Sequence, residues 1–150
     1  MQQWTPNVTV ATVIADEGRY LLVEERDKLS GTTVFNQPAG HLEANETLAC
    51  AALRETLEET GWRIALRGII GMALYTAPGN QVTYVRTTFV GDPLMRVQGA
   101  QLDPDITAIH WLDYEEILAN SARMRSPLVL ASIELQRRGR CYPLDLIYSE

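Results

Sequence analysis

An arginine and three glutamates stand close together in the segment Arg54-Glu55-Thr56-Leu57-Glu58-Glu59. On a helical wheel, at about 100° per residue, the three carboxylates share one arc about 100° wide. Like charges three or four residues apart destabilise an isolated helix by about 0.2–0.5 kcal/mol for each pair. Acids in a last turn also face the negative end of the helix dipole. A divalent cation would turn these acids into ligands, and such hard oxygen ligands suit Mg²⁺ or Mn²⁺.

A loop of special composition precedes these acids. It reads Phe35-Asn36-Gln37-Pro38-Ala39-Gly40. Pro38 favours an extended backbone at Gln37, and Gly40 permits a turn that brings backbone carbonyls close to a helix face. A loop with carbonyls on one side of a cation and a helix with carboxylates on the other side predict a metal cage.

A helix over residues 47–60 must carry the acids. Small and apolar residues recur there at spacings of three and four, which is the helical period. They are Ala49, Ala52, Leu53, Thr56, Leu57 and Thr60. Thr47 or Asn45 can cap the first turn, and Gly61 fits the left-handed residue that ends a helix. We expect one face of this helix to pack on the core and the other to display the acids.

The remaining elements follow from alternation and turn residues. Strands are expected over 8–15 and 19–25, as a hairpin around a turn at 16–18. Further strands are expected over 64–76 and 82–90, with a turn at 77–80, and over 107–112. Helices are expected over 114–120 and 127–138. Ser126 is the expected N-cap of the last helix, which has proline in its first turn.

Seven of these residues match one signature. Gly40, Glu46, Arg54, Glu55, Glu58, Glu59 and Gly61 fit G-x5-E-x7-R-E-U-x-E-E-x-G-U, where U is a bulky aliphatic residue. The segment resembles the signature of the Nudix hydrolases, which hydrolyse a nucleoside diphosphate linked to another group. Thr56 and Trp62 depart from it at the two U positions. Both are packing positions, so the chemistry is expected to be intact.

The resemblance implies a fold and a set of roles. The fold is of the α/β (α+β) class, with a mixed sheet sandwiched between helices. The implied Mg²⁺ ligands are Glu55, Glu58, Glu59 and the backbone carbonyl of Ala39. Arg54 is expected to orient the acids through charge-assisted hydrogen bonds, and Glu46 to buttress the loop or reach an outer metal. Gly40 and Gly61 are expected to be structural.

Segments outside the signature resemble one bacterial branch, the NudJ-type phosphatases. They are residues 8–11, 36–43, 125–129 and 142–145. The resemblance implies release of orthophosphate, one at a time, from nucleoside tri- and diphosphates and from thiamine-type diphosphates. Two alternatives stay open. One is a conventional Nudix pyrophosphohydrolase that gives a nucleoside monophosphate from ADP-ribose or a modified dNTP, and the other is a non-catalytic ligand-binding module.

Several residues are candidates for substrate contacts. Arg125 and Ser126, before a helix, could form a phosphate cradle or a plain cap with a surface charge. His41 could contact phosphate or pack beside the loop, and Gln37 could contact the nucleobase or a phosphate.

Other positions admit both a functional and a structural interpretation. Asp103 and Asp105 are candidates for a further ligand or base, although loop aspartates also form turns. His110 is expected to be structural. Tyr75, Tyr84 and Phe89 could stack on a base or fill the core.

The whole chain limits the function classes. Its 150 residues predict a single domain, 1–150. A net charge of −6 argues against nucleic-acid binding, but not against a small phosphorylated substrate. The first residues lack a basic region followed by an apolar run, and no apolar stretch approaches the roughly 20 residues of a membrane span. We therefore expect a cytoplasmic enzyme that is a monomer or homodimer. Cys50 and Cys141 have no metal-ligand spacing and are not expected to pair, and Cys50 is expected to be buried.

Overall fold

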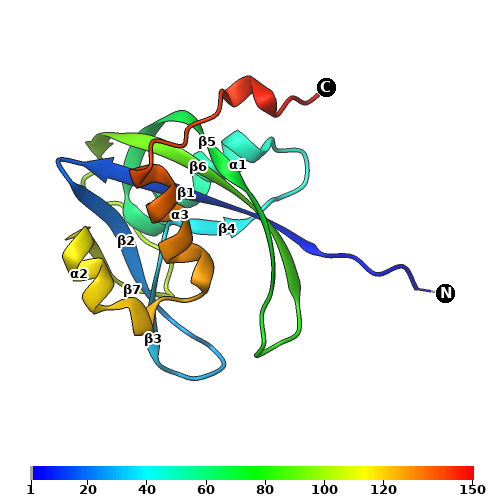
Figure 1. The fold of residues 1–150 in the computed structure, drawn as a ribbon, viewed down its shortest axis with the longest axis horizontal. Helices are drawn as coiled ribbons and strands as arrows, with labels where there is room; N and C mark the ends of the chain where they lie inside the picture. The colour runs from blue at the N-terminus through cyan, green and yellow to red at the C-terminus, as the bar shows by residue number, and fades with distance from the viewer. Residues whose placement is uncertain (1) are drawn as a thin grey trace.

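In the computed structural model, residues 2–150 are described, and they form a mixed sheet with helices on both sides. The strands are β1 (Asn7–Asp16), β2 (Arg19–Arg26), β3 (Thr33–Asn36), β4 (Ala39–His41), β5 (Trp62–Thr76), β6 (Thr83–Arg96) and β7 (Ile106–Asp113). The helices are α1 (Leu48–Thr60), α2 (Tyr114–Ala119) and α3 (Pro127–Arg137), with short 3₁₀ turns η1 (Ser121–Arg123) and η2 (Leu144–Leu146). Figure 1 shows the chain from an extended N-terminal segment to a C-terminal segment that passes along β5.

The sheet is mixed because one of its pairings is parallel. The order is β3-β2-β1-β6-β5, with β4 also paired to β1 and β7 to β2. The β1–β6 pairing is parallel, and the others are antiparallel. The predicted β1–β2 hairpin is present at its tip, where Ala15 pairs with Tyr20. Beyond the tip the strands separate, and β4 takes the free edge of β1. This separation places the loop before α1 between the two halves of the sheet.

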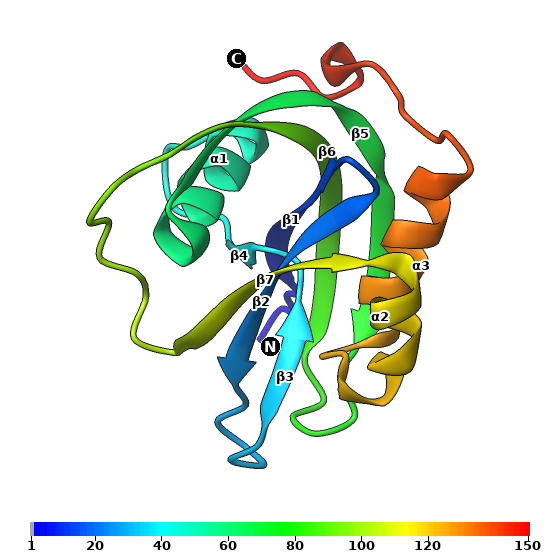
Figure 2. The ribbon, with the colours of Figure 1, turned by 90° about the vertical axis from the view of Figure 1, so that its left-hand side faces the viewer.

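Three helices cover the two faces of the sheet. Figure 2 shows α1 on one side and α2 and α3 on the other. Alternation along β1 supplies both cores: Val10 packs with Ala51 and Ala52 of α1, whereas Val13 packs with Ile117 of α2 and Ile133 of α3. The predicted sandwich of a mixed sheet between helices is confirmed.

The boundaries of α1 are set by its caps, as predicted. Thr47 is the N-cap, and its side chain accepts a hydrogen bond from the Cys50 N–H at 3.1 Å. Gly61 ends the helix with φ of 74°. The burial of Cys50 is a wrong prediction, since its side chain is exposed. Ala51 and Ala52 take the buried positions instead.

The face of α1 that is buried differs from the expected apolar face, because it includes one of the acids. Glu59 belongs to the buried face with only 6% exposure, whereas Leu53, expected in the core, is 39% exposed. Because the helix packs on both β1 and the preceding loop, its contact arc is wider than the apolar stripe alone. Glu59 is therefore buried and Glu55 half-buried, whereas Glu58 stays exposed.

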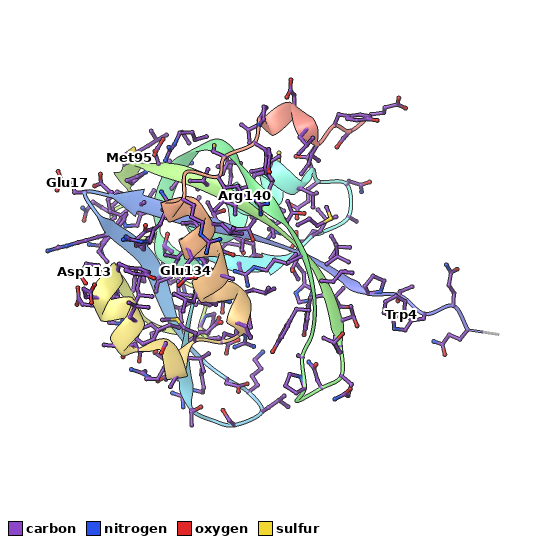
Figure 3. The ribbon with its side chains drawn as sticks, in the orientation of Figure 1. Trp4, Glu17, Met95, Asp113, Glu134 and Arg140 are labelled. Atoms are coloured by element: carbon purple, nitrogen blue, oxygen red, sulfur yellow. The ribbon has the colours of Figure 1, made fainter. Side chains whose placement is uncertain are left out.

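The remaining helices agree with the sequence. Asp113, labelled in Figure 3, caps α2 by accepting a hydrogen bond from the Glu116 N–H at 2.8 Å. Ser126 caps α3, as expected. Trp4 lies on the extended N-terminal segment, away from the sheet (Figure 3).

Strands β3 and β4 were not predicted, because their three or four residues are too short to show alternation and they form by pairing with β2 and β1. Within residues 2–150, no helix has the length and apolar character that crossing a membrane would require.

Candidate active site

Arg54 is the hub of the charged cluster on α1. Its Nε and Nη2 donate to the two carboxylate oxygens of Glu46 at 3.0 and 2.6 Å. Its Nη1 donates to Glu55 at 2.8 Å and to Glu58 at 3.3 Å, and Nη2 also donates to the His41 carbonyl at 3.0 Å. Glu46 in turn accepts the Glu43 N–H at 2.7 Å, which closes the loop onto the helix. These bonds raise the pKa of Arg54 and lower that of Glu46.

Glu59 and β4 are joined by a direct hydrogen bond. The Ala39 N–H donates to Glu59 Oε1 at 2.8 Å. Neighbouring positions of this segment bond to β1, through Thr12 N–H to the Pro38 carbonyl and Leu42 N–H to the Val8 carbonyl. In an antiparallel pair the N–H and C=O of one residue point to the same edge of its strand. The carbonyl of Ala39 is therefore also turned away from β1, toward the edge where Glu59 lies.

Gly40 leaves the space that the Glu55 side chain occupies. A Cβ built on Gly40 would overlap the Glu55 carboxylate. Gly40 pairs with Val10 in β4, on the face of the sheet that α1 covers. The signature glycine is required here because the backbone of β4 approaches a carboxylate, and not because it adopts a left-handed conformation.

Two acids from distant segments act on the α1 acids. The pKa of Glu59 is raised to about 9, chiefly by burial and also by the charges of Glu25, Glu55 and Asp103, against the Ala39 hydrogen bond, which lowers it. Burial also raises the pKa of Glu55 and of Glu25. The Asp103 N–H donates to the Glu58 carbonyl at 3.0 Å, so that loop lies against the end of α1. The site is thus a group of carboxylates, most of them partly or fully buried, whose charges act on one another.

Glu25 was missed in the sequence, where it looks like an ordinary polar residue at the end of a strand. The pairing of β2 with β7 shifts register between Glu24 and Glu25. Such an irregularity redirects a side chain, and Glu25 is partly buried beside Asn36 and Arg125. No local pattern in the sequence indicates this, because the shift depends on β7.

The donor set and the charge of this site fit a divalent cation. Its carboxylate oxygens are hard ligands, Gly40 leaves room for Glu55, and the crowding of acids calls for positive charge. In the described part of the chain, no three His, Cys, Asp or Glu side chains are already gathered closely enough to hold a metal ion. Arg54 bonds one carboxylate oxygen of Glu55 and one of Glu58, and the other oxygen of each accepts no bond from it.

Gln37 is removed from the predicted substrate contacts. Its side chain is 1% exposed. Its amide NH₂ donates to the Val129 carbonyl in α3 at 2.7 Å, and its amide oxygen accepts from Arg86. The buried amide therefore joins β6 to α3, and protein groups take both ends of it.

Arg125 and Ser126 lie together, and His41 lies apart from them. Arg125 forms an ion pair with Glu25 at 3.3 Å. Arg125 and Ser126 both line a cavity of about 470 Å³ beside the first turn of α3, with Glu134 (Figure 3) also at its wall. His41 is exposed, and it lines a different cavity, near Asn7.

The other residues that the sequence left open between a functional and a structural role lie in different parts of the structure. Asp105 forms an exposed ion pair with Lys28 at 3.2 Å. His110 bonds Glu24 at 3.0 Å across β2 and β7, which agrees with a structural role. Phe89 is in the core beneath α1. Tyr75 lines the cavity beside α3, whereas the Tyr84 ring lies 6.3 Å from that of His41.

Comparison with known proteins agrees with this geometry. The NUDIX domain family model matches residues 4–132. The chain belongs to the Nudix family. Phosphatase NudJ of Escherichia coli strain K12 is 42% identical over 142 residues, which cover 95% of this chain and 90% of that protein. Phosphatase NudJ of Shigella flexneri matches to the same extent.

Solved structures place this Nudix chain beside other family members. A NUDIX hydrolase from Nitrosomonas europaea has a TM-score of 0.94 and 40% identity, and the match covers 97% of this chain and 98% of that one. A MutT protein from Methanosarcina mazei Go1, at 20% identity and a TM-score of 0.72, shares the fold. The chain is a Nudix hydrolase of phosphorus-containing anhydrides, homologous to the NudJ phosphatases.

The raised pKa of Glu59 predicts how stability changes with pH. Between the ordinary value of 4.5 and about 9, the folded state holds a proton that the unfolded state has lost. The contribution of protonated Glu59 to the free energy of unfolding is thus fully present below pH 4.5 and is lost as pH rises through about 9. The free energy of unfolding falls there by at most about 1.4 kcal/mol per pH unit. In EDTA, the Tm should fall more steeply with pH for the unmodified protein than for Glu59→Gln. Parallel Tm curves would contradict this assignment.

Proposed function

We propose that this enzyme is an Mg²⁺-dependent phosphatase of nucleoside tri- and diphosphates and of thiamine-type diphosphates, and that it releases orthophosphate. The observation that carries the proposal is the group of buried acids on α1 and β2 beside Gly40. The similarity to the NudJ phosphatases along 95% of the chain supports the choice of substrates and product.

The proposed cation ligands are Glu55, Glu58, Glu59 and the Ala39 carbonyl. A bound Mg²⁺, or Mn²⁺, would neutralise phosphate charge and lower the pKa of a bound water. Arg54 fixes the resting positions of Glu55 and Glu58 through its bonds to both carboxylates. Glu46 and Gly61 are structural in this proposal, because Glu46 ties the loop to Arg54 and Gly61 ends α1.

The reaction needs a proton acceptor and contacts to the substrate. Water attacks the terminal phosphorus, the bond to the bridging oxygen breaks, and Glu55 or Glu58 takes a proton from the water. Arg125 and Ser126, at the first turn of α3, are proposed to bind the outer part of the substrate from the cavity they line. His41, at the other end of β4 from Ala39, is proposed as a phosphate contact.

A product assay tests this function directly. The substrates are GTP, GDP, thiamine diphosphate and ADP-ribose, each with and without Mg²⁺. Free orthophosphate is measured before and after addition of a pyrophosphatase, and Glu59→Gln serves as the inactive control. We expect orthophosphate from both GTP and GDP without the pyrophosphatase, and only with Mg²⁺.

Other products would change the assignment. Phosphate that appears only after the pyrophosphatase, or conversion of ADP-ribose to monophosphates, would identify a conventional Nudix pyrophosphohydrolase. Ligand-induced thermal stabilisation without any turnover would identify a binding module.

A further inference from the structure

Arg86 is a buried cation beside the proposed active site. It lies on β6 with 7% exposure, and burial lowers its pKa to about 10. Among the residues that the structure describes, no carboxylate lies within ion-pair distance of its guanidinium, and the charge that favours its cationic form is that of Glu25. Its Nε has no hydrogen-bond partner there. A buried charge without a paired anion is unfavourable. The role of Arg86 is therefore inferred from the groups that it contacts.

The contacts of Arg86 are two amide side chains. Its Nη1 donates to Asn36 Oδ1 at 3.5 Å, and its Nη2 donates to Gln37 Oε1. A guanidinium can only donate, so it selects the orientation in which each amide oxygen faces it. Both NH₂ groups must then point away. That of Asn36 donates to Glu25 Oε1 at 3.3 Å, and that of Gln37 donates to Val129 in α3.

Glu25 is held at one oxygen and free at the other. Its Oε1 accepts a hydrogen bond from the Asn36 amide and forms an ion pair with Arg125, at 3.3 Å each. Its Oε2 has no partner within residues 2–150. The Glu25 side chain is 14% exposed and Oε2 is not enclosed, so water reaches it. Glu25 lies near the acid cluster, because the loop that bonds the Glu58 carbonyl through the Asp103 N–H also accepts the N–H of Arg26, the neighbour of Glu25, at the Asp105 carbonyl. The charge of Glu25 also acts on Glu59.

We propose that Arg86 and Asn36 are positioning residues that hold Glu25, and that the free Glu25 oxygen orients the attacking water by accepting its hydrogen bond. This inference rests on the proposed function. The proton of that reaction still leaves to Glu55 or Glu58, while Glu25 fixes the direction of attack. Arg86 acts through Asn36, because without the guanidinium the amide could turn its oxygen toward the carboxylate and repel it.

Asn36→Asp tests the relay while it preserves the fold. The new carboxylate gives Arg86 a paired anion, so the Tm should be equal to or above that of the unmodified protein. Glu25 loses its donor and faces a like charge, so kcat should fall on the order of 10–100-fold with KM little changed. Asn120→Asp makes the same chemical change at the end of α2 and should leave kcat unchanged. Normal kcat in Asn36→Asp would overturn the proposal.

Glu25→Gln separates water orientation from metal binding. Its kcat should fall at least as far as that of Asn36→Asp, and the double variant should be no worse than Glu25→Gln, since both changes act through one carboxylate. Calorimetry with Mn²⁺ on the substrate-free variant should give an affinity far above that of Glu59→Gln. An affinity that falls as far as that of Glu59→Gln would make Glu25 a metal ligand and overturn the proposal.

Glu59→Gln distinguishes the failure of this inference from that of the function. If Glu59→Gln keeps its turnover, the proposed function itself is wrong. If Glu59→Gln is inactive while Glu25→Gln and Asn36→Asp are normal, only the role of Glu25 and its relay is wrong.

Discussion

Glu59→Gln is expected to abolish most hydrolysis, by at least about 10²-fold, and to leave the fold intact. Glu59 is the most buried acid of α1 and is under the charges of Glu25, Glu55 and Asp103. The glutamine keeps an oxygen that can accept the Ala39 N–H, so the contact between α1 and β4 survives. The charge that would bind a cation is lost. Turnover of GDP with Mg²⁺ and Mn²⁺ calorimetry on the same preparation measure both effects.

Glu115→Gln is the matched control for this experiment. Glu115 is exposed on α2, on the other side of the sheet from α1. The same loss of a carboxylate there should leave both turnover and Mn²⁺ affinity unchanged. Near-normal turnover in Glu59→Gln would show that the acids of α1 are not the reaction centre, and the proposed function would have to be abandoned.

Gly40→Ala is expected to lower activity on the order of 10²-fold with a small change in stability. The backbone of Gly40 does not adopt positive φ, so alanine fits the strand conformation. The added methyl group overlaps the Glu55 carboxylate, which Arg54 holds at 2.8 Å. Glu55 must move, and its place in the cation site is lost. Steady-state kinetics and the Tm of the purified variant separate the two effects.

Gly71→Ala provides the comparison for this substitution. Gly71 is also a strand glycine without positive φ, and a Cβ there would meet only Arg140 Nη1, at the ordinary contact distance of 3.8 Å. Its activity should be unchanged. Equal activity in both alanine variants would mean that the position of Glu55 against β4 has no part in the reaction.

The sequence by itself determined the element that carries the chemistry. The helix boundaries and the left-handed Gly61 were predicted, and Thr47 was one of the two predicted caps, because capping and helical periodicity act between residues within a few positions of one another. The spacing of Arg54 and the three glutamates also follows from this local geometry. Those residues suffice to indicate the family, which the comparisons show.

The tertiary structure alone decided what surrounds that helix. Gln37 looked like a substrate contact, but β6 and α3 enclose it. Glu25 looked like an ordinary polar residue at a strand end, but it is largely buried at the irregular pairing with β7, and its charge acts on Glu59. Arg86 has no signal in the sequence, since its partners are fifty and forty-nine positions away. Such contacts depend on strand register and on which segments pair, and register is a property of the assembled sheet that no short stretch of sequence contains.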